Sequence, residues 1–101
     1  MEIIEGLVTA SHTPMNEKGD IKFEVIEKYY AFLKRNKIKG IFLNGSTSEG
    51  YHLTTAERKL TLEEWSNVVK DDLDFKIWVF VGHLSTRDAC ELSEHAGSFH
   101  N

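Results

Sequence analysis

Short apolar runs alternate with longer amphipathic stretches along the chain, and this alternation predicts strands and helices in turn. Three apolar runs are interpreted as strands and span residues 6–10, 40–44 and 77–81. The second and third runs are apolar at nearly every position, which is typical of parallel strands that are covered on both faces. The strand centres Val8, Phe42 and Val79 are 34 and 37 residues apart, and such spacings suit βα units with right-handed crossovers.

A helix is predicted after each strand. The first helix has an apolar stripe that consists of Phe23, Ile26, Tyr30 and Leu33. The second begins at Thr54, because Glu57 three residues later completes a capping box. Its buried side is expected to consist of Ala56, Leu60, Trp65, Val68 and Val69. The third begins at Ser85, with Asp88 three residues later. The order βαβαβα predicts an α/β fold with parallel strands and flanking helices.

The composition is that of a globular domain, with 41% hydrophobic and 28% charged residues. The net charge of −4 argues against a nucleic-acid surface, and the basic stretch 34–39 is typical of a solvated helix end. No apolar run approaches the roughly 20 residues that span a bilayer, and no signal peptide is visible. The single cysteine, Cys90, cannot form an internal disulfide and is expected to pack in the core. A cytoplasmic protein without a membrane partner is predicted.

Candidate chemistry lies in the loops after the strands, because ligands of βα folds bind beyond the carboxyl ends of the strands. The loop at 44–50 combines Gly45 with three consecutive hydroxyl residues. Hydroxyls and exposed backbone N–H groups together can bind a small anion such as a carboxylate. No lysine follows the glycine, which excludes a Walker-type phosphate loop. A plain Gly/Ser turn fits the same residues, so both interpretations stay open.

Other groups near these loops have alternative interpretations. Glu49 can act as a base, or it can anchor the backbone by accepting N–H groups. His12, His52 and His83 come one from each loop, and three histidines can bind zinc with an open fourth position. None of them has the close spacing of a typical zinc-binding pair, so no metal site is assigned.

Three motifs occur in an order that resembles one enzyme family. They are Gly-Leu-Val-Thr-Ala at 6–10 with Thr-Pro at 13–14, Gly-Ser-Thr-Ser-Glu-Gly at 45–50, and Leu-Thr-Thr-Ala-Glu-Arg at 53–58. Together they resemble the N-terminal third of the dihydrodipicolinate synthase-like class I aldolases. Asn44, Gly50 and the Glu-Glu-Trp sequence at 63–65 favour the N-acetylneuraminate lyase branch. We interpret residues 1–96 as the N-terminal part of an aldolase-type TIM barrel and residues 97–101 as a tail unlike the family.

The resemblance implies the first (βα)3 portion of a (β/α)8 barrel that is tetrameric and cytoplasmic and uses no metal or cofactor. Members of the family form a Schiff base between a lysine and a pyruvate unit, and the lyases cleave N-acetylneuraminate reversibly to N-acetylmannosamine and pyruvate. By this resemblance, Ser46 and Thr47 hold the pyruvate carboxylate of a small keto sugar acid. This role agrees with the interpretation of their loop as an anion site.

Two departures from the family pattern matter. Ser48 replaces the second glycine of the motif and would strain the loop by roughly 1–2 kcal/mol if that position needs a positive φ. The family's Schiff-base lysine comes from the sixth strand and its proton-relaying tyrosine from the fifth. None of the nine lysines lies inside an apolar strand, since Lys39 and Lys76 precede strands. No catalytic residue is therefore assigned in this chain.

Three hypotheses follow. The leading one is an N-acetylneuraminate lyase-like chain that is truncated and inactive alone, because a complete barrel needs about 250 residues. The first alternative is a non-catalytic fragment that associates with barrel subunits through its apolar sheet edge. The second is another pyruvate aldolase of the dihydrodipicolinate synthase-like family.

Overall fold

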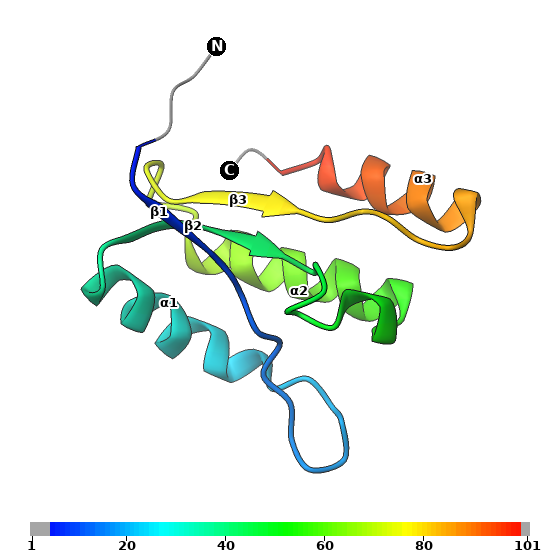
Figure 1. Ribbon diagram of the computed structural model, residues 1–101, viewed down its shortest axis with the longest axis horizontal. Coiled ribbons are helices and arrows are strands. Elements are labelled where there is room, and N and C mark those ends of the chain that lie inside the picture. Colours follow the sequence, from blue (N-terminus) through cyan, green and yellow to red (C-terminus); the bar gives the residue numbers. More distant parts are fainter. Residues whose placement is uncertain (1–4, 100–101) are drawn as a thin grey trace.

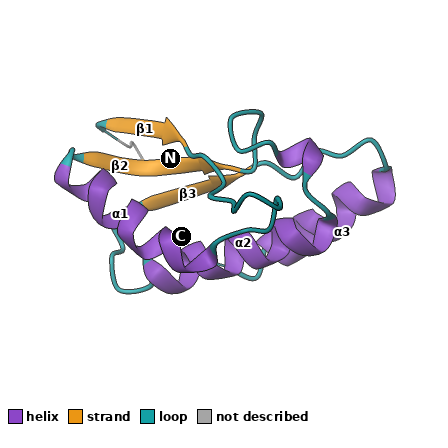
Figure 2. Ribbon diagram, turned by 90° about the horizontal axis from the view of Figure 1, so that it is seen from below, coloured by secondary structure: helices purple, strands orange, loops and turns teal. Residues whose placement is uncertain are grey.

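A three-stranded parallel sheet with helices on one side makes up the described part of the chain, residues 5–99 of a computed structural model. In chain order the elements are β1 (Leu7–Ala10), the 3-10 turn η1 (Phe23–Val25), α1 (Ile26–Arg35), β2 (Ile38–Leu43), the 3-10 turn η2 (Gly50–His52), α2 (Thr55–Val68), β3 (Lys76–Val79) and α3 (Thr86–Ala96). The strands pair in the order β1–β2–β3 (Figure 1). Figure 2 shows the three helices on the same side of the sheet. The predicted α/β architecture is confirmed.

The strand register decides which side chains face the helices. Ile41 and Leu43 of β2 point toward the helices and are fully buried. Phe42, paired with Ala10 and Trp78, points to the opposite face and is 40% exposed. There it lines a shallow apolar pocket of about 210 Å³ with Val8 and Trp78. Cover on both faces was expected, but within residues 5–99 helices cover only one face.

The core lies between the sheet and helices α1 and α2. Its buried members are Ile26, Leu33, Ile41, Leu43, Leu62, Trp65, Val69 and Phe75. The Trp65 ring is stacked on Phe75 with 6.3 Å between centroids, and Tyr29 meets it edge-on at 5.7 Å. The stripe predicted for the first helix is confirmed, because Ile26 and Leu33 are buried and the other two members pack against the core. Each such large apolar side chain stabilises the fold by roughly 1.5–3 kcal/mol.

Both predicted helix starts are confirmed. At the start of α2, the Glu57 N–H donates to Thr54 Oγ1 at 3.0 Å, and the Thr54 N–H donates to Glu57 Oε1 at 2.8 Å. At the start of α3, the Asp88 N–H donates to Ser85 Oγ at 3.2 Å. These bonds satisfy backbone donors that have no partner within the helix, so local sequence determines where the helices begin.

The face that α2 buries matches the predicted one only in part: Trp65 and Val69 are buried and Val68 packs against the core, as expected. Leu60 is 51% exposed and Ala56 is also exposed. The buried positions of this segment are Arg58, Thr61, Leu62, Trp65 and Val69. Arg58 and Thr61 can lie inside because their polar atoms have partners; Thr61 Oγ1 donates to the Glu57 C=O at 2.8 Å. A prediction based on apolar residues alone therefore missed the polar members of the buried face and included two exposed positions.

Two lysines lie closer to the sheet than predicted. Lys39 is inside β2 and Lys76 is the first residue of β3. Strand pairing uses backbone groups, so the ladder continues past the end of the apolar run. Both lysines still lie toward the amino ends of their strands, away from the loops that follow the carboxyl ends.

The position of Cys90 and the character of the helices were also considered in the sequence. Cys90 was expected in the core but is exposed on α3, because this helix buries Leu92 instead. Among residues 5–99, no helix combines the length and the apolar character that crossing a bilayer would require.

Candidate functional site

The 44–50 loop lies at the carboxyl end of β2 and presents Ser46 and Thr47 to solvent. Beneath them, the Gly50 N–H donates to the Gly45 C=O at 3.0 Å and closes the loop. The two hydroxyl side chains are therefore exposed on a backbone whose ends are tied together. Hydroxyls and neighbouring backbone N–H groups are suitable donors for a carboxylate.

Left-handed backbone occurs on both sides of these hydroxyls. Asn44 has φ 62° and Glu49 has φ 59°, values that are costly for residues other than glycine. At Gly50 a Cβ would overlap the Asn44 carbonyl oxygen, so the loop needs glycine there. The Glu49 carboxylate is exposed, and no described N–H donates to it. Glu49 therefore shapes the turn through its backbone and not by accepting N–H groups, the anchoring role considered for it.

Ser48 is fully buried under the exposed pair. Its hydroxyl accepts the Asn44 N–H at 3.1 Å and donates to the Ser11 C=O. Its carbonyl accepts the Thr13 hydroxyl at 2.6 Å. The φ of Ser48 is not positive, so the strain considered for this position does not arise. The left-handed positions are its neighbours instead, and the serine hydroxyl links this loop to the segment after β1.

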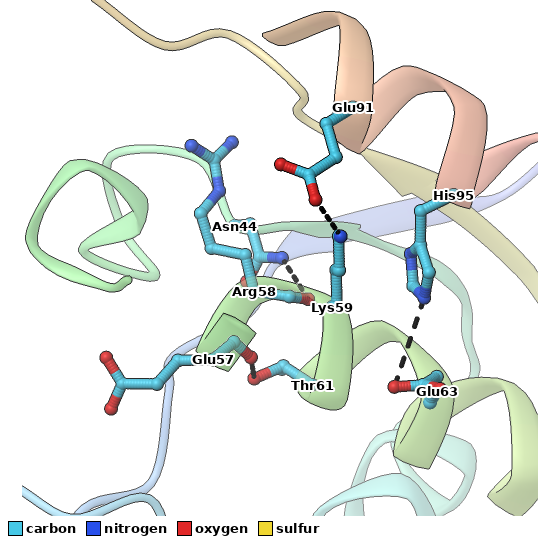
Figure 3. A network of polar contacts seen from close by, with 8 residues as sticks. All are labelled: Asn44, Glu57, Arg58, Lys59, Thr61, Glu63, Glu91 and His95. Atoms are coloured by element: carbon cyan, nitrogen blue, oxygen red, sulfur yellow. Dashed lines mark hydrogen bonds and ion pairs between the residues drawn. The ribbon is translucent and has the colours of Figure 1, made fainter. Parts of the chain in front are cut away.

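Arg58 ties the loop to the end of β3, a role that sequence reasoning missed. Its guanidinium donates to the carbonyls of Gly82 at 2.8 Å and Phe80 at 2.6 Å, and lies 5.6 Å from the centre of the Phe80 ring. Its own carbonyl accepts the Asn44 side-chain amide at 3.2 Å (Figure 3). Burial lowers the pKa of Arg58 from its ordinary value. The available signal was its spacing, because Arg58 lies four residues before Leu62 and seven before Trp65, on the same helical stripe.

One ion pair and one contact between a histidine and a glutamate connect α2 with α3 (Figure 3). Lys59 Nζ lies 2.5 Å from Glu91 Oε1, and His95 Nε2 lies 3.9 Å from Glu63 Oε2. Both glutamates are about half exposed, so each pair contributes at most about 1 kcal/mol. The pairs help to hold α3, and with it the loop after β3, next to the 44–50 loop.

The three histidines considered for zinc are not brought together. The His12 backbone N–H donates to the Tyr29 hydroxyl at 3.1 Å, and the His52 side chain is exposed. His83 Nδ1 accepts the Ser85 N–H at 3.0 Å. Within the described residues, no three His, Cys, Asp or Glu side chains are grouped so that they could hold a metal ion.

Two of the nine lysines, Lys18 and Lys22, lie in the segment that follows β1, and both are exposed; all nine fall in the described part of the chain, and none of them is buried. Lys39 and Lys76 belong to the amino ends of strands, and Lys59 is paired with Glu91. The described lysines therefore include no amine in a water-poor pocket, which a Schiff-base lysine requires.

A separate polar cluster joins α1 to the segment between α2 and β3. The Tyr30 hydroxyl donates to Asp72 Oδ2 at 2.6 Å, and Lys34 Nζ lies 2.8 Å from the same oxygen. Lys34 and then Tyr30 lower the pKa of the Asp72 carboxyl. Burial and the Asp72 carboxylate raise the pKa of Tyr30 to about 12. This cluster precedes β3, at the opposite end of the sheet from the 44–50 loop, and we assign it to stability.

Comparison with known proteins identifies the family. The model described as "Dihydrodipicolinate synthetase family" matches residues 3–99, almost the whole chain. The chain belongs to the dihydrodipicolinate synthetase family. The resemblance found in the sequence motifs is thereby confirmed.

Curated relatives from this family are N-acetylneuraminate lyases. The Homo sapiens enzyme is 45% identical over 94 residues, which are 92% of this chain and 29% of the relative. The Gallus gallus enzyme is 43% identical over 96 residues, which are 94% of this chain and 31% of the relative. The chain thus spans about 30% of the length of these relatives.

Solved structures of the family have the same fold over this segment. The N-acetylneuraminate lyase of Aliivibrio salmonicida superposes with a TM-score of 0.91 at 35% identity, covering 98% of this chain and 32% of that one. The Proteus mirabilis N-acetylneuraminate lyase gives 0.89 at 30% identity, covering 95% and 32%. The three βα units therefore match the N-terminal part of a TIM-barrel aldolase, as the sequence predicted.

Proposed function

We propose that this chain carries the carboxylate-binding part of a pyruvate-dependent aldolase site of the N-acetylneuraminate lyase type, with Ser46 and Thr47 holding the pyruvate carboxylate. The observation that carries the proposal is the exposure of these two hydroxyls on a loop fixed from below by buried Ser48. Membership of the family, with relatives named N-acetylneuraminate lyase, supports the choice of substrate class. The partner is then a small keto acid, with no metal, cofactor, nucleic acid or membrane.

The chemistry of such a site needs orientation and a nucleophile. Hydroxyl and N–H donors hold the carboxylate so that the adjacent carbonyl carbon faces an attacking amine. That amine must be a lysine in a water-poor pocket, where its pKa falls. None of the nine lysines occupies such a position. We therefore propose that this sequence binds the keto acid without forming the Schiff base itself, and that a cytoplasmic homotetrameric barrel is the assembly in which the complete site works.

A titration with pyruvate, followed by amide NMR, tests the binding. The amide signals of Ser46 and Thr47 should shift, and the double variant S46A/T47V should lose the shifts. The variant S93A removes an exposed hydroxyl on α3 and serves as the matched control. Shifts centred elsewhere, or unchanged in the double variant, would contradict the assignment.

Borohydride trapping tests the second half of the proposal. Incubation of the chain with pyruvate and borohydride should leave its mass unchanged in mass spectrometry. A pyruvyl-lysine adduct at one site would show that the chain forms the Schiff base without any other segment.

The apolar sheet face favours a second candidate function, a non-catalytic chain that associates with barrel subunits. Val8, Phe42 and Trp78 are each more than a third exposed and line one pocket. Apolar patches of this kind often mark protein interfaces. Co-purification with a full-length homologue would support this function, and a stable, monodisperse monomer would count against it.

A further inference from the structure

The segments that follow β1 and β2 are held together by two hydrogen bonds at Ser48. Its hydroxyl bridges the Asn44 N–H and the Ser11 C=O, which are separated by more than thirty residues in sequence. The Thr13 hydroxyl adds a second link by donating to the Ser48 C=O at 2.6 Å. All four residues are buried, with Ser48 and Ser11 fully inaccessible.

The bridge acts directly on the conformation of the binding loop. Asn44 and Glu49 are both left-handed and lie on either side of the exposed Ser46 and Thr47. A non-glycine residue keeps such a conformation only when its surroundings hold it there. The Ser48 hydroxyl is the acceptor for the Asn44 N–H, and without it this buried donor would lose its partner.

We propose that Ser48 is a positioning residue, whose hydroxyl bridge between Ser11 and Asn44 fixes the direction of the Ser46 and Thr47 donors toward a carboxylate. The inference rests on the proposed function, because it assigns Ser48 a part in the same site. The loop gains its shape from a side-chain bond that spans two βα units.

The test compares variants of the whole chain in pyruvate titrations under conditions where each is fully folded. S48A removes the hydroxyl and keeps the Cβ, T13V removes the second link without a change in shape, and S48T retains a hydroxyl. The control is S66A, because the buried Ser66 hydroxyl has no hydrogen-bond partner among the described residues. Hydrogen exchange of the Asn44 amide reports on the bridge independently of any ligand.

S48A should raise the dissociation constant for pyruvate roughly tenfold and T13V severalfold, while S66A leaves it unchanged. S48T should recover part of the affinity that S48A loses, and the Asn44 amide should exchange at least tenfold faster in S48A. If S48A does not fold, the T13V titration decides in its place.

The outcomes separate the two proposals. The wild-type chain binds pyruvate if the proposed function is right. If S48A then has the same dissociation constant as wild type, the role of Ser48 is refuted and the proposed function stands. T13V takes the place of S48A in this comparison if S48A is unfolded. Absence of pyruvate binding by the wild-type chain refutes the proposed function, and the positioning role with it. Faster Asn44 exchange in S48A without loss of affinity shows that the bridge is structural only and also overturns the inference.

Discussion

The Arg58 side chain is the most informative place to perturb this fold. It is 1% exposed, and its guanidinium donates to two carbonyls at the carboxyl end of β3. The variant R58M keeps an unbranched apolar stem but removes the charge and all donors. The variant R58K keeps the charge as a compact ammonium group, which cannot reproduce the fork that reaches both carbonyls.

The expected loss follows from the contacts. Two hydrogen bonds from a charged group contribute about 1.5–3 kcal/mol each. The contact of the guanidinium with the Phe80 ring adds about 0.5–1 kcal/mol. Removal of the cation also removes the cost of burying it and of leaving its Nε without a partner, which offsets a few kcal/mol. The net expectation is a destabilisation of about 2–4 kcal/mol for R58M and about 1–2 kcal/mol for R58K.

Urea unfolding measures this loss, with the fluorescence of Trp65 and Trp78 as the probe. The matched control is R87M, because Arg87 is exposed on α3; its free energy of unfolding should stay within about 0.5 kcal/mol of wild type. If the free energy of unfolding of R58M also stays within about 0.5 kcal/mol of wild type, water satisfies the carbonyls of Phe80 and Gly82. The expected loss from the two hydrogen bonds is then wrong. Equal losses in R58M and R58K would instead show that the planar fork, and not the charge, is what matters.

Two further predictions concern an acidic group and a glycine. The Asp72 carboxyl has a lowered pKa, chiefly because of Lys34, so its contribution to stability is present above about pH 4 and is lost as the pH falls through the lowered value. D72N should therefore flatten the acid side of a curve of unfolding free energy against pH, and an unchanged curve would contradict this. G50A should lower the free energy of unfolding by about 1–3 kcal/mol, because its Cβ overlaps the Asn44 carbonyl oxygen. G97A, which meets only atoms at 3.5 Å or more, is its control in thermal unfolding.

Much of the fold could be predicted from local pattern. The strand positions follow from short apolar runs, and the starts of α2 and α3 follow from Thr54 and Ser85, whose partners lie three residues away. These signals are contained within a few neighbouring residues. They do not depend on the rest of the structure, and for that reason the predicted elements are confirmed.

The errors arise where a residue's environment depends on distant segments. The inner face of α2 includes Arg58, whose partners Phe80 and Gly82 follow β3 and lie more than twenty residues away. Apolar Leu60 could not be recognised as exposed without that knowledge. Ser48 was considered as one of three hydroxyls for an anion and for its backbone strain, and its buried bonds were missed because its partner Ser11 precedes it by 37 residues. Hydrogen bonds to distant segments thus determine which polar side chains are buried, and the periodicity of the sequence does not show these bonds.

The distribution of buried polar groups separates the site from the rest of the fold. In the described part of the chain, five of the six buried polar side chains lie in or against the loops at the carboxyl edge of the sheet: Ser11, Thr13, Asn44, Ser48 and Arg58. Burying polar groups costs free energy unless each finds a partner, and an apolar core would be a simpler source of stability. The core around Trp65 and Phe75 already supplies that stability with few polar atoms. The polar network therefore fixes the shape of the loops at this edge of the sheet, and the proposed carboxylate site would require such a fixed shape.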